Sequence, residues 1–313
     1  MRDRRRRQLI WPWFDLRTVK YFTTCKYARN TLARKSSVKL GLVQMTMTDD
    51  SATNLERASQ MTKDAARNGA QIVCLPELFT SLYFPQKEKA EAIPETIPGK
   101  TTRLLSKIAK ENGVVLVAGS LYEQSKGHLY NTATVFDMDG RMLGKYRKVH
   151  IPQDESFYEQ NYFSSGNQFK VFKTRFGKIA VLICFDQWYP EAARVCRLNG
   201  AEIIFYPTAI GSVKRIQQVE GSWQEAWEAV QRGHAISNSV IVAAVNRVGV
   251  EGEMNFWGGS FVSDQFGKIL FRAGNKEGVF VVNCDRSLGK EVEAGWGFLR
   301  NRKPSRYTKI VRG

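Results

Sequence analysis

The stretch VLICFDQWYPEAAR, residues 181–194, ends an apolar run with a cysteine. The run is typical of a buried strand, and PEAAR, residues 190–194, indicates a helix with Pro at an early position. Cys184 therefore lies between the carboxyl end of a strand and the amino end of a helix, where α/β sheets place ligands. A helix amino terminus favours a thiolate there, and a buried core cysteine is the alternative interpretation.

Strands and helices alternate on both sides of this segment. The patterns predict strands at 38–45, 71–77, 114–120, 201–207, 240–246, 258–264 and 278–284, and helices at 54–69, 99–113, 189–199 and 222–236. Two hairpins interrupt the alternation, at 129–148 with its turn at Asp139-Gly140 and at 169–185 with its turn at Phe176-Gly177. A purely parallel sheet would not need hairpins, so we predict mixed sheets covered by helices.

The composition favours one soluble globular domain with a sizeable core. The chain has 313 residues, of which 43% are hydrophobic and 25% are charged. No apolar run reaches the roughly 18 residues of a membrane-spanning helix, so we expect no membrane association. The five cysteines are dispersed, which favours a reducing compartment, and we expect a cytoplasmic protein. The three histidines lack metal-ligand spacing, so neither a metal nor a cofactor is expected.

The net charge of +17 is concentrated at the amino terminus. Residues 1–36 contain 11 Lys and Arg against 2 Asp and Glu. We predict a disordered basic extension at 1–36 followed by a folded domain at 37–313. A targeting presequence and an extension without a role are alternatives. Nucleic-acid binding would depend on this extension alone, so no nucleic-acid partner is expected.

Three segments contain residues that fit nucleophilic catalysis. A cysteine nucleophile needs a base, and both His150 and Glu77 are candidates. Glu77 is the last residue of the buried strand predicted at 71–77, where a carboxylate is costly unless it is paired or used. In KYRKVHIP, residues 145–152, period two places Lys148 on the same strand face as Tyr146, which predicts an inward-pointing cation.

The segments CLPELF, KYRKVHIP and VLICFDQWYPEAAR together resemble the nitrilase superfamily of carbon–nitrogen hydrolases. The resemblance covers about residues 38 to 307, and DQWYPEAAR, GAEIIFYPTAIGS and WGFLRNRKPSRY are typical of its N-carbamoylputrescine amidohydrolase branch. It implies a four-layer αββα sandwich. It also implies a homodimer or higher homo-oligomer in which the C-terminal tail reaches over a neighbour.

The same resemblance implies the roles of the catalytic residues. Cys184 is the expected nucleophile and Glu77 its general base. Lys148 and the backbone N–H of Phe185 are expected to stabilise the oxyanion of the tetrahedral intermediate. Glu159, in SFYEQNYFSSGN, matches a second glutamate of the family that holds the lysine and positions the substrate.

Position 187 indicates the substrate class. Relatives that hydrolyse carbamoyl amino acids carry Arg there, whereas this chain has Gln187, which suits a substrate with an amine or a neutral group at its far end. We therefore expect a small ureido amine or amide, with N-carbamoylputrescine the first candidate and polyamine biosynthesis the pathway. Asp154 and Glu155 are expected to bind a distal ammonium, and Asp186 is expected to be a structural turn residue. The other predicted substrate-binding residues are Trp188, Tyr83 and Asn246, the last with helix or turn capping as an alternative.

Other functions remain open at this stage. Phe185 stands where the branch has Trp, and the segments HIPQDESFYEQNYF and 213–235 depart from the branch near the expected distal end of the substrate. An ω-amidase or another carbamoyl-amine or amide hydrolase of the superfamily is the near alternative. A non-catalytic binding module tethered by the basic extension is the alternative from another class.

Overall fold

The computed structural model describes residues 37–311, so the predicted disordered extension at 1–36 lies outside the described residues. Two six-stranded sheets form the centre of the unit that begins at Ser37. The first has the order β15 (Gly278–Asp285), β1 (Ser37–Gln44), β2 (Ile72–Cys74), β3 (Val115–Ser125), β4 (His128–Phe136) and β5 (Met142–Arg147). The second has the order β14 (Ile269–Arg272), β13 (Phe261–Ser263), β10 (Ile241–Asn246), β8 (Ile203–Thr208), β7 (Gly177–Val181) and β6 (Val171–Thr174).

Each sheet combines parallel and antiparallel pairs. In the first sheet β1, β2 and β3 pair in parallel, and the flanking strands are antiparallel. In the second sheet β7, β8 and β10 pair in parallel, and the outer strands are antiparallel. Both predicted hairpins are present, as β4–β5 and β6–β7. The prediction of mixed sheets is therefore confirmed.

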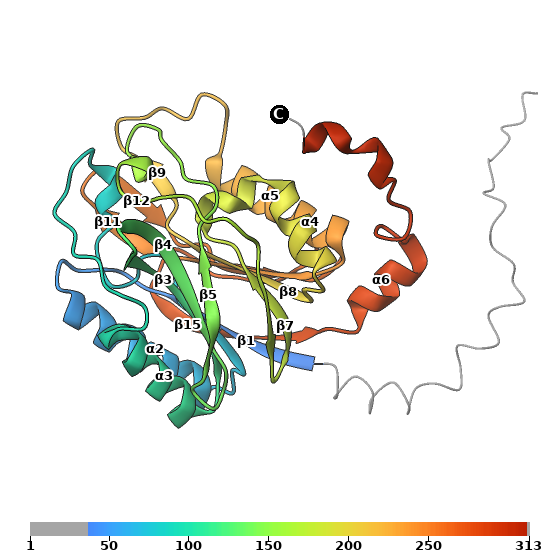
Figure 1. Ribbon diagram of the computed structural model, residues 1–313, viewed down its shortest axis with the longest axis horizontal. Coiled ribbons are helices and arrows are strands. Elements are labelled where there is room, and N and C mark those ends of the chain that lie inside the picture. Colours follow the sequence, from blue (N-terminus) through green and yellow to red (C-terminus); the bar gives the residue numbers. More distant parts are fainter. Residues whose placement is uncertain (1–36, 312–313) are drawn as a thin grey trace, which may run out of the picture. The chain divides into compact units, whose positions relative to one another are not determined.

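Helices cover the outer face of each sheet. Figure 1 shows α2 (Ser51–Arg67) and α3 (Lys100–Asn112) side by side along the first sheet, and α4 (Pro190–Leu198) and α5 (Trp223–Asn238) together on the opposite side of the molecule. The layers follow the order helix, sheet, sheet, helix. This is the predicted αββα sandwich, and α6 (Leu288–Trp296) leads the chain away from it.

The pattern of β1 shows why the sandwich forms. Leu40 and Leu42 point into the apolar core that contains both sheets, and Val43 points to the other face, into the core beneath α2 and α3. Alternate side chains of one strand thus fill two different cores. Gly41 also faces α2, and a Cβ at this position would lie 2.9 Å from the Cβ of Ala70. A larger residue there would push the helix layer away from the sheet.

Some elements were not predicted. A three-stranded sheet of β11 (Val248–Glu251), β12 (Met254–Trp257) and β9 (Gly211–Val213) lies outside the two main sheets. The strand predicted at 258–264 begins only at Phe261, because Gly258 and Gly259 adopt positive φ angles of 68° and 66°. Short 3₁₀ helices connect other elements: η2 (Phe84–Gln86), η3 (Glu159–Asn161), η4 (Cys184–Trp188), η5 (Pro304–Arg306) and η6 (Thr308–Ile310).

Among residues 37–311, we find no helix with both the length and the apolar character needed to cross a membrane.

Candidate active site

Cys184 occupies a sharp turn between strand and helix. β7 ends at Val181 rather than continuing to Phe185 as predicted, and Cys184 opens the 3₁₀ helix η4 with a φ of 43°. This left-handed conformation costs a non-glycine residue about 1–3 kcal/mol and persists only where the surroundings enforce it. The side chain is 7% exposed, and its thiol donates a long hydrogen bond of 3.9 Å to the carbonyl of Ala209.

Asp186 holds this turn in place. Its Oδ2 accepts from the backbone N–H of Ile183 at 2.9 Å and from the hydroxyl of Tyr146 at 2.6 Å. Its Oδ1 accepts from the backbone N–H of His150 at 3.0 Å and contacts His150 Nδ1 at 2.7 Å. The predicted structural role of Asp186 is therefore confirmed. The imidazole of His150 is committed to Asp186 and to a stack on Tyr189, which leaves Glu77 as the candidate base.

Three buried charged groups meet beside this cysteine. Lys148, which follows β5, places its Nζ 3.0 Å from Glu77 Oε1 and 2.8 and 2.7 Å from the two carboxylate oxygens of Glu159. None of the three side chains is more than 1% exposed. The sequence predicted this group from segments far apart in the chain, and the two sheets and η3 bring it together.

Two residues that the sequence analysis did not single out support Glu77. Asn131 of β4 donates from Nδ2 to Glu77 Oε1 at 2.8 Å. Arg247 donates from Nη2 to the carbonyls of Glu77 and Leu78 at 2.7 and 3.0 Å, and from Nη1 to the carboxylate of Glu251. Arg247 is completely buried. Charged side chains are rarely buried unless they are paired, so an arginine directly after the apolar strand β10 was the sequence signal that could have identified it.

The site raises the pKa values of its groups for different reasons. Burial raises the pKa of the Cys184 thiol well above its ordinary value, and Glu77 raises it further, while Lys148 opposes both. Burial would lower the pKa of Lys148, but the charges of Glu159 and Glu77 outweigh it and raise that pKa. Burial raises the pKa of Glu159 to about 7 despite the nearby Lys148 ammonium.

The structure does not provide the helix amino terminus that was expected to favour a thiolate at Cys184. The expected stabilisation came from a helix amino terminus, but a 3₁₀ turn separates Cys184 from α4, which begins at Pro190. The apolar surroundings and the two carboxylates instead keep the thiol protonated. A base must remove this proton before or during attack.

Cys184 opens into a cavity of about 590 Å³. Among residues 37–311, its wall contains four acidic residues, several aromatic residues and no Lys or Arg. The lining residues are Pro152, Asp154, Glu155, Phe157, Glu159, Cys184, Phe185, Gln187, Trp188, Ile210, Ile216, Glu220, Trp223 and Ala226. The predicted site residues Asp154, Glu155, Gln187 and Trp188 thus share the cavity with the cysteine. Glu220 and Trp223 were not predicted as site residues.

Comparison with known proteins identifies the family. Residues 39–294 match the family model described as carbon–nitrogen hydrolase. The chain belongs to the carbon–nitrogen hydrolase family. It is 39% identical over 294 residues to the N-carbamoylputrescine amidase of Arabidopsis thaliana, covering 90% of this chain and 97% of that protein. It is 35% identical over 285 residues to the citrullinase of Francisella tularensis, covering 88% of this chain and 99% of that protein.

Solved structures agree with this result. The crystal structure of a carbon–nitrogen hydrolase from Helicobacter pylori G27 aligns with a TM-score of 0.84 and 36% sequence identity, covering 89% of this chain and 99% of that chain. The protein is thus an amidohydrolase of the nitrilase superfamily, as its sequence motifs indicated.

Other predicted residues of this carbon–nitrogen hydrolase have structural partners. Asn246 is fully buried and bonds to the backbone of Ile210 and Gly258, outside the cavity wall. Tyr83 lies behind Glu159 and donates from its hydroxyl to Glu159 Oε1 at 2.8 Å. The structure therefore brings neither Asn246 nor Tyr83 into the cavity wall, and it favours the capping alternative for Asn246.

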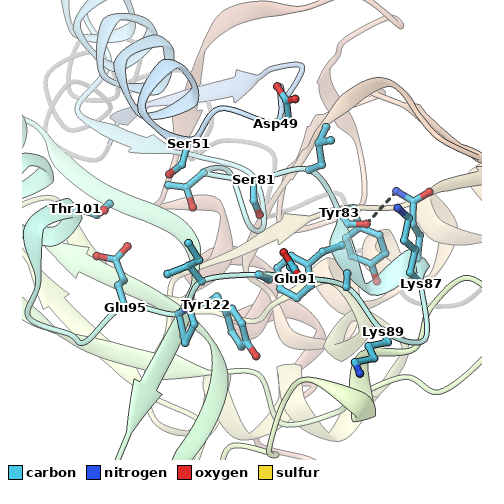
Figure 2. A pocket seen from close by; sticks show the side chains of 18 of the residues that line it. Asp49, Ser51, Ser81, Tyr83, Lys87, Lys89, Glu91, Glu95, Thr101 and Tyr122 are labelled. Carbon is cyan, nitrogen blue, oxygen red and sulfur yellow. Dashed lines mark hydrogen bonds between the residues drawn. The ribbon is translucent and has the colours of Figure 1, made fainter.

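A larger cavity of about 800 Å³ lies on the other side of Tyr83. Figure 2 shows it with Asp49 and Ser51 at one side and Tyr122 and Lys89 at the other. Its wall mixes acidic, basic and apolar side chains and contains neither the cysteine nor Lys148. The smaller cavity, which holds the predicted site residues, is therefore the candidate active site of this carbon–nitrogen hydrolase. Residues 37–311 contain no cluster of His, Cys, Asp and Glu that could hold a metal ion.

Proposed function

We propose that this carbon–nitrogen hydrolase cleaves N-carbamoylputrescine, or a closely similar ureido amine, through a covalent intermediate on Cys184. The observation that carries the proposal is the buried Glu77–Lys148–Glu159 group beside a strained cysteine at the end of an acidic cavity. The relative named N-carbamoylputrescine amidase supports the same substrate class.

In the first step Cys184 Sγ attacks the carbamoyl carbon. Glu77 takes the thiol proton, and its Oε2 suits this task because it has no hydrogen-bond partner among residues 37–311. The bond from the carbamoyl carbon to its terminal nitrogen breaks, and Glu77 passes the proton to that nitrogen, which leaves as ammonia. The product on the enzyme is an S-carbamoyl cysteine that carries the rest of the amine.

Lys148 and the N–H of Phe185 stabilise the oxyanion that forms during this step. The Lys148 ammonium stays charged because Glu159 and Glu77 raise its pKa. A fixed charge in a site shielded from water is worth far more than the same charge in water. Glu159, bonded to both Lys148 and Tyr83, keeps the ammonium in position.

In the second step Glu77 deprotonates a water molecule that attacks the S-carbamoyl carbon. The carbon–sulfur bond breaks, the thiol recovers its proton, and an N-substituted carbamic acid leaves. The carbamic acid decomposes to carbon dioxide and the free amine, which for N-carbamoylputrescine is putrescine. Polyamine biosynthesis is the corresponding pathway.

The charges of the cavity wall support a cationic substrate. Asp154, Glu155, Glu159 and Glu220 line the cavity, and no Lys or Arg does. An anionic ω-amide or carbamoyl amino acid would meet these carboxylates, and the nearby guanidinium of Arg215 is already paired with Glu155. Citrulline is the second candidate, because it carries a ureido group and an ammonium and because one relative is named citrullinase.

Ammonia release from a substrate panel tests the proposal. The panel contains N-carbamoylputrescine, citrulline, N-carbamoyl-β-alanine, glutamine and an ω-amide of a dicarboxylic acid, each with the wild type and with Cys184→Ala. We expect the highest kcat/KM for N-carbamoylputrescine and no turnover by Cys184→Ala. Preferred turnover of the anionic substrates would contradict the assignment of the substrate, and turnover by Cys184→Ala would contradict the mechanism.

We also propose a cytoplasmic homodimer or larger homo-oligomer. The four described cysteines are free, as expected in a reducing compartment. Apolar side chains remain exposed on α4, with Val195 at 37% and Leu198 at 48%, and near the C-terminus, with Trp296 at 61% and Ile310 at 60%. Burial of these surfaces between copies would remove them from water. Native mass spectrometry tests this proposal, and a monomer at micromolar concentration would contradict it.

A further inference from the structure

The carboxylates that line the catalytic cavity differ in their partners. Glu155 is paired with Arg215, whose Nε lies 2.9 Å from Glu155 Oε1. Glu159 is paired with Lys148 at the reactive end. Two acidic side chains of the wall, Asp154 and Glu220, have no ion-pair partner among residues 37–311. Apart from the Glu77–Lys148–Glu159 group at the reactive end, these two carry the unpaired negative charge of the cavity wall.

Glu220 is the one whose carboxylate is held by a neighbouring side chain. The indole Nε1 of Trp223 donates to Glu220 Oε1 at 2.7 Å, and both residues line the cavity. The backbone N–H of Glu220 and the indole N–H of Trp223 lower the pKa of this carboxyl, so it is charged at neutral pH. Asp154 has no comparable tether, because the hydrogen bonds that it forms within residues 37–311 join its backbone to that of Phe157.

A second observation indicates a ligand in this cavity. Gln187 is fully buried, and its Oε1 accepts from the indole of Trp227 at 2.7 Å. This bond fixes the orientation of the amide, and Gln187 Nε2 is left without a partner among the described residues while the side chain lines the cavity. A buried donor without an acceptor is costly, so the site is built for a ligand that supplies a neutral oxygen.

We propose that Glu220, tethered by Trp223, binds the distal ammonium of the substrate and selects for cationic ureido amines. The inference rests on the proposed function and names the residue that recognises the far end of that substrate. The carboxylate supplies the counter-charge, and the aromatic side chains of the wall, which include Trp223 and Trp188, suit a cation through their π faces. Gln187 Nε2 donates to the ureido oxygen or to a neutral acceptor nearby.

The test compares a charged substrate with a neutral substrate of the same shape. N-carbamoylputrescine carries the ammonium, and N-pentylurea replaces that ammonium with a methyl group. For the wild type we expect a clear preference for the cation. In Glu220→Gln we expect KM for N-carbamoylputrescine to rise roughly tenfold while kcat stays close to that of the wild type, because a charge-assisted contact is lost away from the reacting atoms. For N-pentylurea we expect neither constant to change.

Two further variants sharpen the assignment. Trp223→Phe keeps an aromatic side chain and removes the indole N–H, so KM for the cation should rise less than in Glu220→Gln. Asp154→Asn is the matched control, since it removes the other unpaired carboxylate of the wall, and we expect a smaller effect than that of Glu220→Gln.

The outcomes separate this inference from the proposed function. If Glu220→Gln changes KM for both substrates equally, or if Asp154→Asn alone removes the preference, the assignment of Glu220 is wrong while the ureido-amine function stands. If the wild type turns over neither substrate, the proposed ureido-amine function is wrong, and the assignment of Glu220 is wrong with it. Circular dichroism of each variant distinguishes a local effect from misfolding.

Discussion

At the scale of the residue, the backbone of Cys184 and its surroundings have separate effects on the thiol. Cys184 lines the cavity with a φ of 43°, an angle that a residue with a Cβ rarely adopts. Burial and the two carboxylates then keep the thiol protonated until a substrate arrives. In the proposed mechanism the backbone therefore presents the nucleophile and Glu77 activates it, since the surroundings of Cys184 do not favour a resting thiolate.

We predict that Cys184 is alkylated by iodoacetamide faster than Cys74, Cys196 or Cys284. All four thiols are buried, but only Cys184 lines the catalytic cavity. Glu77→Gln should slow the labelling of Cys184 at least tenfold, as expected for the loss of a general base, which is worth roughly 10² to 10⁴ in rate. Mass spectrometry of peptides after timed labelling measures both effects. Equal and slow labelling of all four cysteines would contradict an activated nucleophile.

We predict a pH-dependent contribution of Glu159 to stability. Its pKa is raised from 4.5 to about 7 by burial, so the folded state holds a proton that the unfolded state releases between these values. The contribution is complete below pH 4.5 and is lost as pH rises through 7. The difference in unfolding free energy between the wild type and Glu159→Gln should therefore fall from pH 5 to pH 8, by up to about 3 kcal/mol. Urea unfolding at both pH values measures this difference, and a rise with pH would contradict the assignment.

At the scale of the element, Arg247 joins pieces that are distant in sequence. It lies between β10 and β11, and its guanidinium bonds the loop after β2 that carries Glu77. The same loop contains Leu78, whose φ of 47° is in the left-handed region and whose N–H bonds Ser120 Oγ at 2.9 Å. The position of Glu77, the proposed general base, is thus held by contacts from β3 and from the residue between β10 and β11.

We predict that Arg247→Leu lowers the free energy of unfolding by about 3–5 kcal/mol, because it leaves Glu251 charged and buried without its partner. Arg272→Leu is the matched control, since the Arg272 side chain is 52% exposed and its partner Glu228 keeps a second cation in Arg232, and we expect a loss below about 1 kcal/mol. Chemical denaturation of both variants measures the two losses. Similar losses in the two variants would show that burial of the Arg247 pair does not decide its contribution.

Strand and helix prediction succeeded where local pattern dominates. The hairpin β4–β5 follows from alternation around Asp139-Gly140, and α3 follows from helical spacing with Gly113 closing it in the left-handed conformation. The short strands β9, β11 and β12 have little local signal, because each is stabilised mainly by pairing with the others. These three strands can therefore be identified only once the fold has brought residues 211–213 next to residues 248–257.

At the scale of the whole molecule, the catalytic unit lies within the part of the chain that begins at Ser37. The family match begins at residue 39, and every side chain placed in the site comes later. We predict that a protein beginning at Ser37 retains the thermal midpoint and the kcat/KM of the full chain. Thermal unfolding and ammonia release measure both. A loss of activity with the fold intact would assign the basic segment at 1–36 a role in catalysis.

The sequence by itself determined the αββα architecture and the family, and it predicted that Glu77, Lys148, Glu159 and Cys184 belong to one site, where the structure places them close together. Alternation, hairpin turns and the order of motifs can be recognised along the chain without knowing which residues are in contact. Only the tertiary structure decided the protonation of Cys184, the support from Asn131 and Arg247, and the place of Glu220 and Trp223 in the cavity wall. These features depend on burial and on distances between segments remote in sequence, and a pKa or an ion pair has no meaning until those distances are fixed.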